Sequence, residues 1–189
     1  MKIALFGGAF DPPHLGHQRV AEEIIAQQLV DQVWYVPVYI HPWEARYGKL
    51  DMVPYEQRLE MVKLMLPSQT QLQEFREVSF TYPTLVYFSQ KYPEHDFSWL
   101  MGSEYLDRFD DFLAGHPRLI DFQFFIYPRT GHPLAPLQSN MTPLTEVEEV
   151  AISSSDVRER IQTGQSIFQL VHPAVAAYIQ EHQLYLKRN

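Results

Sequence analysis

The sequence contains no cysteine, and this absence removes several kinds of chemistry. Disulfide bonds, cysteine-ligated zinc and thiol nucleophiles are all excluded. No window approaches the roughly 18 consecutive apolar residues of a membrane-spanning helix, and the first residues lack a basic region followed by a long apolar one. We therefore expect a cytoplasmic protein with no membrane partner.

Dense clusters of lysine and arginine are also lacking, and the net charge is −8. Nonspecific binding to nucleic acid requires clustered cations that neutralise backbone phosphates. We therefore expect no nucleic-acid partner. A small anionic substrate is still possible, because a few hydrogen-bond donors at a site can bind an anion although the net charge of the protein is negative.

Two common phosphate-binding fingerprints are missing as well. A Walker P-loop is absent because Gly48-Lys49 is followed by leucine and no glycine lies five residues earlier. The pattern Gly-x-Gly-x-x-Gly does not occur either. Hydride transfer on a dinucleotide-binding fold therefore lacks its fingerprint.

The chain does have the composition of an ordinary globular protein. Its 189 residues are 46% hydrophobic and 20% charged, which suits one domain with a sizeable core. Strand-like and helix-like patterns alternate along it. The expected strands are 3–6, 33–38, 75–80, 97–101, 122–127 and 150–152, and the expected helices are 20–29, 55–66, 83–91 and one with Leu106, Phe109 and Leu113 on a single stripe. Residues 39–55 and 130–146 are expected to be loops.

This alternation predicts an α/β fold, with a Rossmann-like parallel sheet that helices cover on both faces. We expect one domain over residues 1–189, with an α/β core to residue 152 and a small C-terminal helical region over 153–189. Ligands of such folds bind at the carboxyl ends of the strands. The turns that follow several strands are expected to face one crevice there.

The most informative stretch is Gly7-Gly8-Ala9-Phe10-Asp11-Pro12-Pro13-His14-Leu15-Gly16-His17. It lies between an expected strand and an expected helix, where glycines let bare backbone and a helix N-terminus approach a phosphate. His14 and His17 are three residues apart, so both can reach one ligand as hydrogen-bond donors or general acids. A tight turn with two surface histidines is the alternative. We favour a phosphate site.

A second motif, Ile152-Ser153-Ser154-Ser155-Asp156-Val157-Arg158, follows another expected strand. Its serines can cap a helix and offer hydroxyl and backbone N–H groups to an anion. Arg158, about one turn further on, can clamp phosphate oxygens with its planar guanidinium. A plain serine cap with an exposed arginine is the alternative.

The first motif resembles the opening signature of the nucleotidyltransferase superfamily, and specifically of the nicotinate (or nicotinamide) mononucleotide adenylyltransferases. The second, ISSSDVRERI, is similar to the ISSTxIR signature of that family, and the likeness covers nearly the whole chain. The resemblance implies catalytic roles for His14, His17 and Arg158. It implies that ATP contacts Gly7, Gly8, Phe10, Ser153, Ser154, Ser155, Gly102 and Arg129, with Arg129 near adenine.

The segment Ser79-Phe80-Thr81-Tyr82-Pro83-Thr84-Leu85 is similar to the family's SYTxDTL, which binds the pyridine carboxylate or amide. The resemblance implies this role for Thr81 and Thr84, although Pro83 replaces the family's aspartate. A helix N-terminus with Thr81 as its cap is the alternative. Phe112 stands where the family stacks a tryptophan on the pyridine ring, and a core position is the alternative.

Three cationic side chains near the expected pyridine side of the site also have a structural alternative to a binding role. Arg46 and Lys49, in the long loop, can neutralise the phosphate of the pyridine nucleotide or simply face solvent. Arg58 lies near a family arginine, although arginines are common on helix surfaces. Asp11 can support a metal through water, but a turn role is at least as plausible.

We therefore predict an adenylyltransferase of NAD biosynthesis that joins ATP and nicotinate mononucleotide, giving deamido-NAD and pyrophosphate. The acceptor phosphate attacks the ATP α-phosphorus in line, with Mg²⁺ bridging phosphate oxygens and no dedicated metal site on the protein. Other acceptors stay open: nicotinamide mononucleotide, phosphopantetheine or a polyol phosphate. A nucleotide sensor without turnover is the alternative from another class, and the oligomeric state is undetermined.

Overall fold

The central strand, β1 (Lys2–Gly8), shows how the sequence builds the sheet. Its alternate residues face two different cores, with Ala4 and Phe6 in one and Ile3 and Leu5 in the other. A strand that is covered on both faces reads as an unbroken apolar run. The computed structural model describes residues 1–40, 52–77 and 80–187.

Six strands form one parallel sheet in the order β3-β2-β1-β4-β5-β6. The strands after β1 are β2 (Gln32–Pro37), β3 (Thr70–Leu72), β4 (Asp96–Gly102), β5 (Gln123–Tyr127) and β6 (Met141–Pro143). The strand order reverses between β1 and β4, which is the point where Rossmann-like folds bind ligands. The predicted fold class is confirmed.

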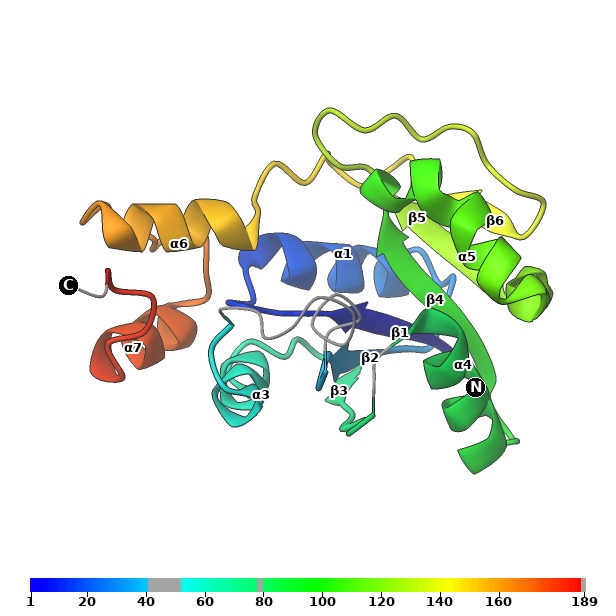
Figure 1. Ribbon diagram of the computed structural model, residues 1–189, viewed down its shortest axis with the longest axis horizontal. Coiled ribbons are helices and arrows are strands. Elements are labelled where there is room, and N and C mark those ends of the chain that lie inside the picture. The colour runs from blue at the N-terminus through cyan, green and yellow to red at the C-terminus, as the bar shows by residue number, and fades with distance from the viewer. Residues whose placement is uncertain (41–51, 78–79, 188–189) are drawn as a thin grey trace.

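Helices cover both faces of the sheet. The α-helices are α1 (Leu15–Ala26), α3 (Tyr55–Lys63), α4 (Thr81–Lys91), α5 (Phe109–Gly115), α6 (Ser154–Gln162) and α7 (Pro173–Glu181), and the 3₁₀ helices are η1 (Ser103–Arg108) and η2 (Pro117–Asp121). Helices α1, α3, α6 and α7 contribute to the core that contains Phe6, whereas α4 and α5 contribute to the core that contains Leu5. Helices α6 and α7 lie at one end of the molecule and α4 and α5 at the other (Figure 1).

The prediction of a strand over residues 75–80 is wrong for the residues that the structure describes there. Phe75 is 5% exposed, but aromatic packing against Tyr87 and Phe88 buries it rather than strand pairing. The third strand is the polar segment Thr70–Leu72, which pairs with β2 at the edge of the sheet. An edge strand needs no apolar run, so the hydrophobic pattern did not indicate it.

The prediction of a strand over residues 150–152 is also wrong. Val150 makes one isolated bridge with Arg129, and the carbonyls of Val150 and Ile152 accept hydrogen bonds from the Arg129 guanidinium. The sixth strand is instead Met141–Pro143, inside the segment expected to be a loop. Its proline is tolerated because β6 lies at the other edge of the sheet.

The helix expected to carry Leu106, Phe109 and Leu113 is divided. A 3₁₀ helix, η1, precedes α5, and the buried Leu106 and Phe109 are three residues apart. This spacing matches the three residues per turn of a 3₁₀ helix. No helix in the described ranges has the length and hydropathy that a membrane crossing requires.

The C-terminal segment shares the larger core with the sheet. Val157 of α6 and Val175 of α7 are fully buried, in the same cluster as Phe6 and Val20. The helices after residue 152 therefore pack into the same core as the sheet, and the division into domains stays a prediction.

Candidate active site

The first motif lies at the carboxyl end of β1, directly before α1, whose N-cap is His14. The rings of His14 and His17 stack, with centroids 3.6 Å apart and planes 24° apart. The backbone N–H of His14 donates a hydrogen bond to His17 Nδ1 at 3.1 Å. Because Nδ1 accepts this bond, the proton of a neutral His17 belongs on Nε2.

The environment keeps both imidazoles neutral at neutral pH. Burial, followed by the charge of Arg129, lowers the pKa of His14 to about 3, and Asp156 opposes this shift. Burial, His14 and Arg129 hold the pKa of His17 well below its ordinary value. The pair can therefore donate hydrogen bonds to phosphate oxygens through N–H groups without carrying positive charge. His14 Nδ1 is buried without a hydrogen-bond partner among the described residues, which is costly unless a ligand or water supplies one.

The glycines of the motif make room for aromatic rings. A Cβ on Gly7 would collide with the indole of Trp99, and a Cβ on Gly8 would lie 3.1 Å from Phe10 Cζ. Phe10 is 1% exposed, and its ring centroid is 4.9 Å from that of His17. Its backbone has φ +48°, so a turn in the left-handed region directs the ring into the core. Phe10 thus supports His17 from inside the protein.

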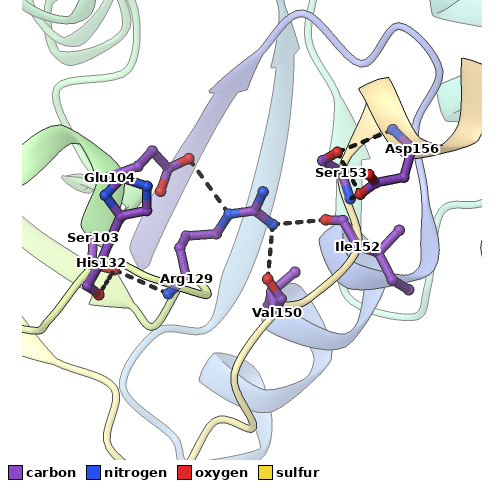
Figure 2. Close-up of polar contacts among 8 residues, drawn as sticks. All are labelled: Ser103, Glu104, Arg129, His132, Val150, Ile152, Ser153 and Asp156. Carbon is purple, nitrogen blue, oxygen red and sulfur yellow. Dashed lines mark hydrogen bonds and ion pairs between the residues drawn. The ribbon is translucent and has the colours of Figure 1, made fainter. Parts of the chain in front are cut away.

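The second motif begins with a helix cap. Ser153 is the N-cap of α6: its hydroxyl accepts a hydrogen bond from the Asp156 backbone N–H, and its own N–H donates to Asp156 Oδ2 at 2.9 Å. These contacts are drawn in Figure 2. The Ser153 contacts lower the pKa of Asp156. The alternative reading of a serine cap therefore describes Ser153 well.

The structure brings the two motifs together. Ser154 Oγ donates to the carbonyl oxygen of Pro12 at 2.8 Å, and Arg158 Nη1 donates to the carbonyl oxygen of Asp11 at 2.6 Å. Arg158 Nη2 also donates to Ser155 Oγ at 3.0 Å. The helix α6 is thereby held against the loop that carries His14.

Arg129 links the end of β5 with the segment that leads into α6. Its Nη1 donates to the carbonyls of Val150 and Ile152 at 3.1 and 2.7 Å, and its Nε lies 3.7 Å from Glu104 Oε1. Figure 2 shows the guanidinium between these groups. Burial raises the pKa of Glu104, whereas Arg129 opposes the shift.

Two further features lie beside Arg129. A Cβ on Gly102 would come too close to the Glu104 carboxylate and to Arg129 Cγ, so a side chain at this turn would force both side chains to shift. A hollow of about 400 Å³ is lined by Pro128, Arg129, Gly131, His132, Pro133, Leu134 and Glu149. The place predicted for adenine is therefore next to an open surface.

Among the residues that the structure describes, those predicted to bind the pyridine nucleotide show fewer contacts with one another than the residues of the two motifs do. Thr84 is 1% exposed, and its hydroxyl donates to the Phe80 carbonyl at 2.7 Å. Thr81 is the first residue of α4 and is partly exposed, and Phe80 rather than Thr81 occupies the cap position. Phe112 is partly buried beside Phe109 and Tyr105. Arg46 and Lys49 lie outside the described residues.

Three side chains outside the two motifs support the first motif, and of these the sequence analysis had singled out only Arg58. The hydroxyl of Tyr35 donates to the His17 carbonyl at 3.0 Å, and that of Tyr185 donates to Asp11 Oδ1 at 2.8 Å. Arg58 is 2% exposed rather than on the helix surface, and it donates to the Ala9 carbonyl at 2.7 Å. The burial of an arginine or tyrosine depends on segments far away in the sequence, so local spacing gives no signal for it.

In the described part of the chain, the side chains do not assemble a set of metal ligands of their own. No group of three or more histidine, aspartate or glutamate side chains is close enough there to hold a metal ion. Asp11 is 3% exposed, and its carboxylate accepts hydrogen bonds from Tyr185 and Val53. A cation that takes its ligands from phosphates and water fits this site, because it needs few protein ligands.

A parallel sheet in this strand order, with a glycine turn, a paired histidine motif and a helix N-terminus at its carboxyl edge, defines a Rossmann-like nucleotidyltransferase. The family model described as cytidylyltransferase-like matches residues 5–160. The chain belongs to this family and, within it, to the nicotinate-nucleotide adenylyltransferases, as its relatives show. The predicted enzyme class and its place in NAD biosynthesis are confirmed.

Relatives of this chain carry the name "Probable nicotinate-nucleotide adenylyltransferase", and two of them show the extent of the match. The protein from Shouchella clausii (strain KSM-K16) is 34% identical over 199 residues, covering 100% of this chain and 98% of the relative. The protein from Geobacillus thermodenitrificans (strain NG80-2) is 33% identical, covering 97% of this chain and 86% of the relative.

Solved structures support the fold. Nicotinic acid mononucleotide adenylyltransferase from Plasmodium falciparum, complexed with NaAD, matches with a TM-score of 0.78 at 19% identity and covers 97% of both chains. A second structure of that enzyme, complexed with APC, matches with a TM-score of 0.77. Nucleotidyltransferases of this family use a divalent metal ion.

Proposed function

We propose that this chain transfers the adenylyl group of ATP to nicotinate mononucleotide, forming deamido-NAD and pyrophosphate. An oxygen of the acceptor phosphate forms a bond to the ATP α-phosphorus, while the bond from that phosphorus to the bridging oxygen of the pyrophosphate breaks. The observation that carries the proposal is the stacked, neutral histidine pair at the N-terminus of α1. Positioning and charge stabilisation suffice for such a transfer, with no protein nucleophile.

The phosphates of ATP bind between the two motifs in this proposal. His17 donates from Nε2 to a phosphate oxygen, His14 binds beside it, and the backbone at Gly7 and Gly8 allows close approach. The short bond from Arg158 to Asp11 brings the N-terminus of α6 to the same place, so Ser154, Ser155 and Arg158 face the leaving pyrophosphate. Its N-terminal N–H groups and helix dipole favour an anion there.

The two bases lie on either side of the phosphates. We place adenine in the hollow beside Arg129, with Gly102 at its border, because that hollow adjoins the segment before Ser153. The pyridine nucleotide lies toward Thr81 and Phe112, with Arg46 and Lys49 as candidate partners of its phosphate. The buried contact of Thr84 supports a role in shaping the N-terminus of α4.

Mg²⁺ is the divalent ion that we propose, bound by ATP phosphates and water. When bound, it neutralises charge that develops on the leaving pyrophosphate. The chain's own residues, His17, Ser154 and Arg158, would orient the triphosphate. The cytoplasm remains the predicted location.

The test is pyrophosphate release from Mg²⁺-ATP with nicotinate mononucleotide, nicotinamide mononucleotide and phosphopantetheine in parallel. We expect a clear preference for nicotinate mononucleotide. A preference for the nicotinamide form would keep the transfer and revise the pocket around Thr81. Binding of ATP with no turnover on any acceptor would overturn the proposal in favour of a nucleotide sensor.

A further inference from the structure

The carboxylate of Asp11 is held by groups from two distant segments. Asp11 as a residue is 3% exposed, and its Oδ1 accepts hydrogen bonds from the Tyr185 hydroxyl at 2.8 Å and from the Val53 N–H at 3.3 Å. A buried carboxylate is costly without donors, because it loses its hydration. Tyr185 therefore supplies Asp11 with a side-chain hydrogen bond from the tail that follows α7.

The tail after α7 follows a defined path. The Leu184 N–H donates to the Ile179 carbonyl at 3.0 Å, and the Leu184 side chain is 8% exposed. Gln183 and Tyr185 have φ values of +50° and +63°, in the left-handed region that residues with a Cβ rarely adopt. Such a conformation persists where surrounding contacts determine it. The contact with Asp11 is one of these.

The loop between β1 and α1 is bonded from other elements as well. Arg58 of α3 donates to the Ala9 carbonyl, and Arg158 and Ser154 of α6 donate to the carbonyls of Asp11 and Pro12. These three contacts hold the backbone of the loop. Tyr185 differs from them, because it holds the loop through the side chain of Asp11, three residues before His14.

We propose that Tyr185 is a positioning residue for adenylyl transfer: its hydroxyl, acting through the Asp11 carboxylate, fixes the loop that places His14 and His17. The inference rests on the proposed function, because the histidine pair is the group that it positions. Small displacements of a catalytic group reduce the rate strongly even when the fold persists. Tyr185 does not itself contact the reacting atoms.

The charges around Asp11 make this role measurable. The charges of Arg58 from α3 and Arg158 from α6 act on the carboxylate, together with the hydrogen bond from Tyr185 of the tail. Burial raises the pKa of Asp11, and the hydrogen bonds from Tyr185 and Val53 and both arginines oppose that shift. Removal of the Tyr185 hydroxyl therefore raises the pKa of Asp11 further. As the pH falls, the carboxylate then becomes protonated at a higher pH than in the wild type.

The experiment compares Tyr185→Phe with Tyr178→Phe, which removes a hydroxyl from the same C-terminal region. Pyrophosphate release from Mg²⁺-ATP and nicotinate mononucleotide is measured between pH 5 and 9. We expect kcat of Tyr185→Phe to fall about tenfold with little change in the KM for ATP. Its acidic limb should move to higher pH, whereas Tyr178→Phe should follow the wild type.

Asp11→Asn supplies the double-mutant cycle. If Tyr185 acts through the carboxylate, Tyr185→Phe adds little to the loss already caused by Asp11→Asn, and the shift of the acidic limb disappears. Full additivity of the two losses would overturn the proposal. So would a Tyr185→Phe profile that coincides with that of Tyr178→Phe.

A second measurement separates this inference from the proposed function. Hydrogen exchange of the His14 amide, which donates to His17 Nδ1, reports on the loop without any turnover. We expect faster exchange in Tyr185→Phe than in the wild type and in Tyr178→Phe. Absence of pyrophosphate release by the wild type overturns the proposed function, whereas unchanged exchange in Tyr185→Phe overturns the positioning role.

Discussion

The phosphate side and the acceptor side of the candidate site are built differently. On the phosphate side, Asp11 and His14 are each 3% exposed, and contacts from α3, α6 and the C-terminal tail reach the loop that carries them. On the acceptor side, the hydroxyl of Thr84 donates to the carbonyl of Phe80, the N-cap residue of its own helix, and Thr81 is partly exposed.

This difference separates two tasks. Charge stabilisation at a phosphate depends on fixed donors, because donors that must reorganise contribute less to the transition state. On the proposed acceptor side, Thr84 is buried and its hydroxyl shapes the start of α4, whereas Thr81 and Phe112 are only partly buried and can vary more freely. We therefore propose that the interlocked part of the molecule carries the transfer chemistry and that the part around α4 and α5 carries specificity.

The largest effect is expected at His17. In His17→Asn the side-chain oxygen can still accept the hydrogen bond from the His14 N–H, but the donor at Nε2 is lost. Turnover should fall by about 10²–10⁴-fold, as for other lost catalytic donors. The measurement is kcat for pyrophosphate release, together with urea unfolding.

The exposed His182 provides the control, because His182→Asn removes an imidazole at the end of α7. This variant should retain wild-type turnover. Equal turnover in His17→Asn and the wild type would remove the phosphate side from the mechanism.

An effect of intermediate size is expected on the pH dependence of the free energy of unfolding. The pKa of His14 is about 3 in the folded protein and 6.5 ordinarily. Between these values the unfolded chain binds more protons, so the free energy of unfolding falls as the pH falls below about 6.5. The contribution of His14 between pH 7 and pH 5 is about 2 kcal/mol.

Urea unfolding at pH 7 and pH 5 measures this difference. His14→Asn has no imidazole to titrate, so its stability should change less between the two values than that of the wild type. The exposed-site variant His182→Asn should keep the wild-type difference. The same pH difference in all three proteins would show that His14 is not buried in a neutral form.

The smallest effect distinguishes two threonines on the acceptor side. Thr84→Val removes the hydrogen bond to Phe80 and should lower the free energy of unfolding by about 1 kcal/mol, with the KM for nicotinate mononucleotide unchanged. Thr81→Val should raise that KM about fivefold with little change in stability. Steady-state kinetics with varied acceptor, together with urea unfolding, measures both. The reverse pattern would exchange the two assignments and weaken the contrast between the two sides.

The order of strands and helices was largely predictable, because the central strands are buried on both faces of the sheet and therefore appear in the sequence as apolar runs. β1, β2, β4 and β5 are confirmed in this way. The two edge strands were missed, since Thr70–Leu72 is polar and Met141–Pro143 contains a proline. An edge strand is defined by its pairing with a neighbouring strand. The local sequence pattern does not specify that pairing.

By itself the sequence determined the class of chemistry. Glycines, a spaced histidine pair and a serine motif each follow a strand or precede a helix, and such local signals depend on short-range backbone geometry. It also excluded cysteine chemistry and a Walker P-loop.

Only the tertiary structure decided how these groups are held. It placed the hydroxyl of Tyr185 on Asp11, 174 residues away, and the guanidinium of Arg158 on the same loop. It also made the histidines neutral, because burial and the charge of Arg129 lower their pKa values. These properties arise from contacts between distant segments, and no local spacing contains them.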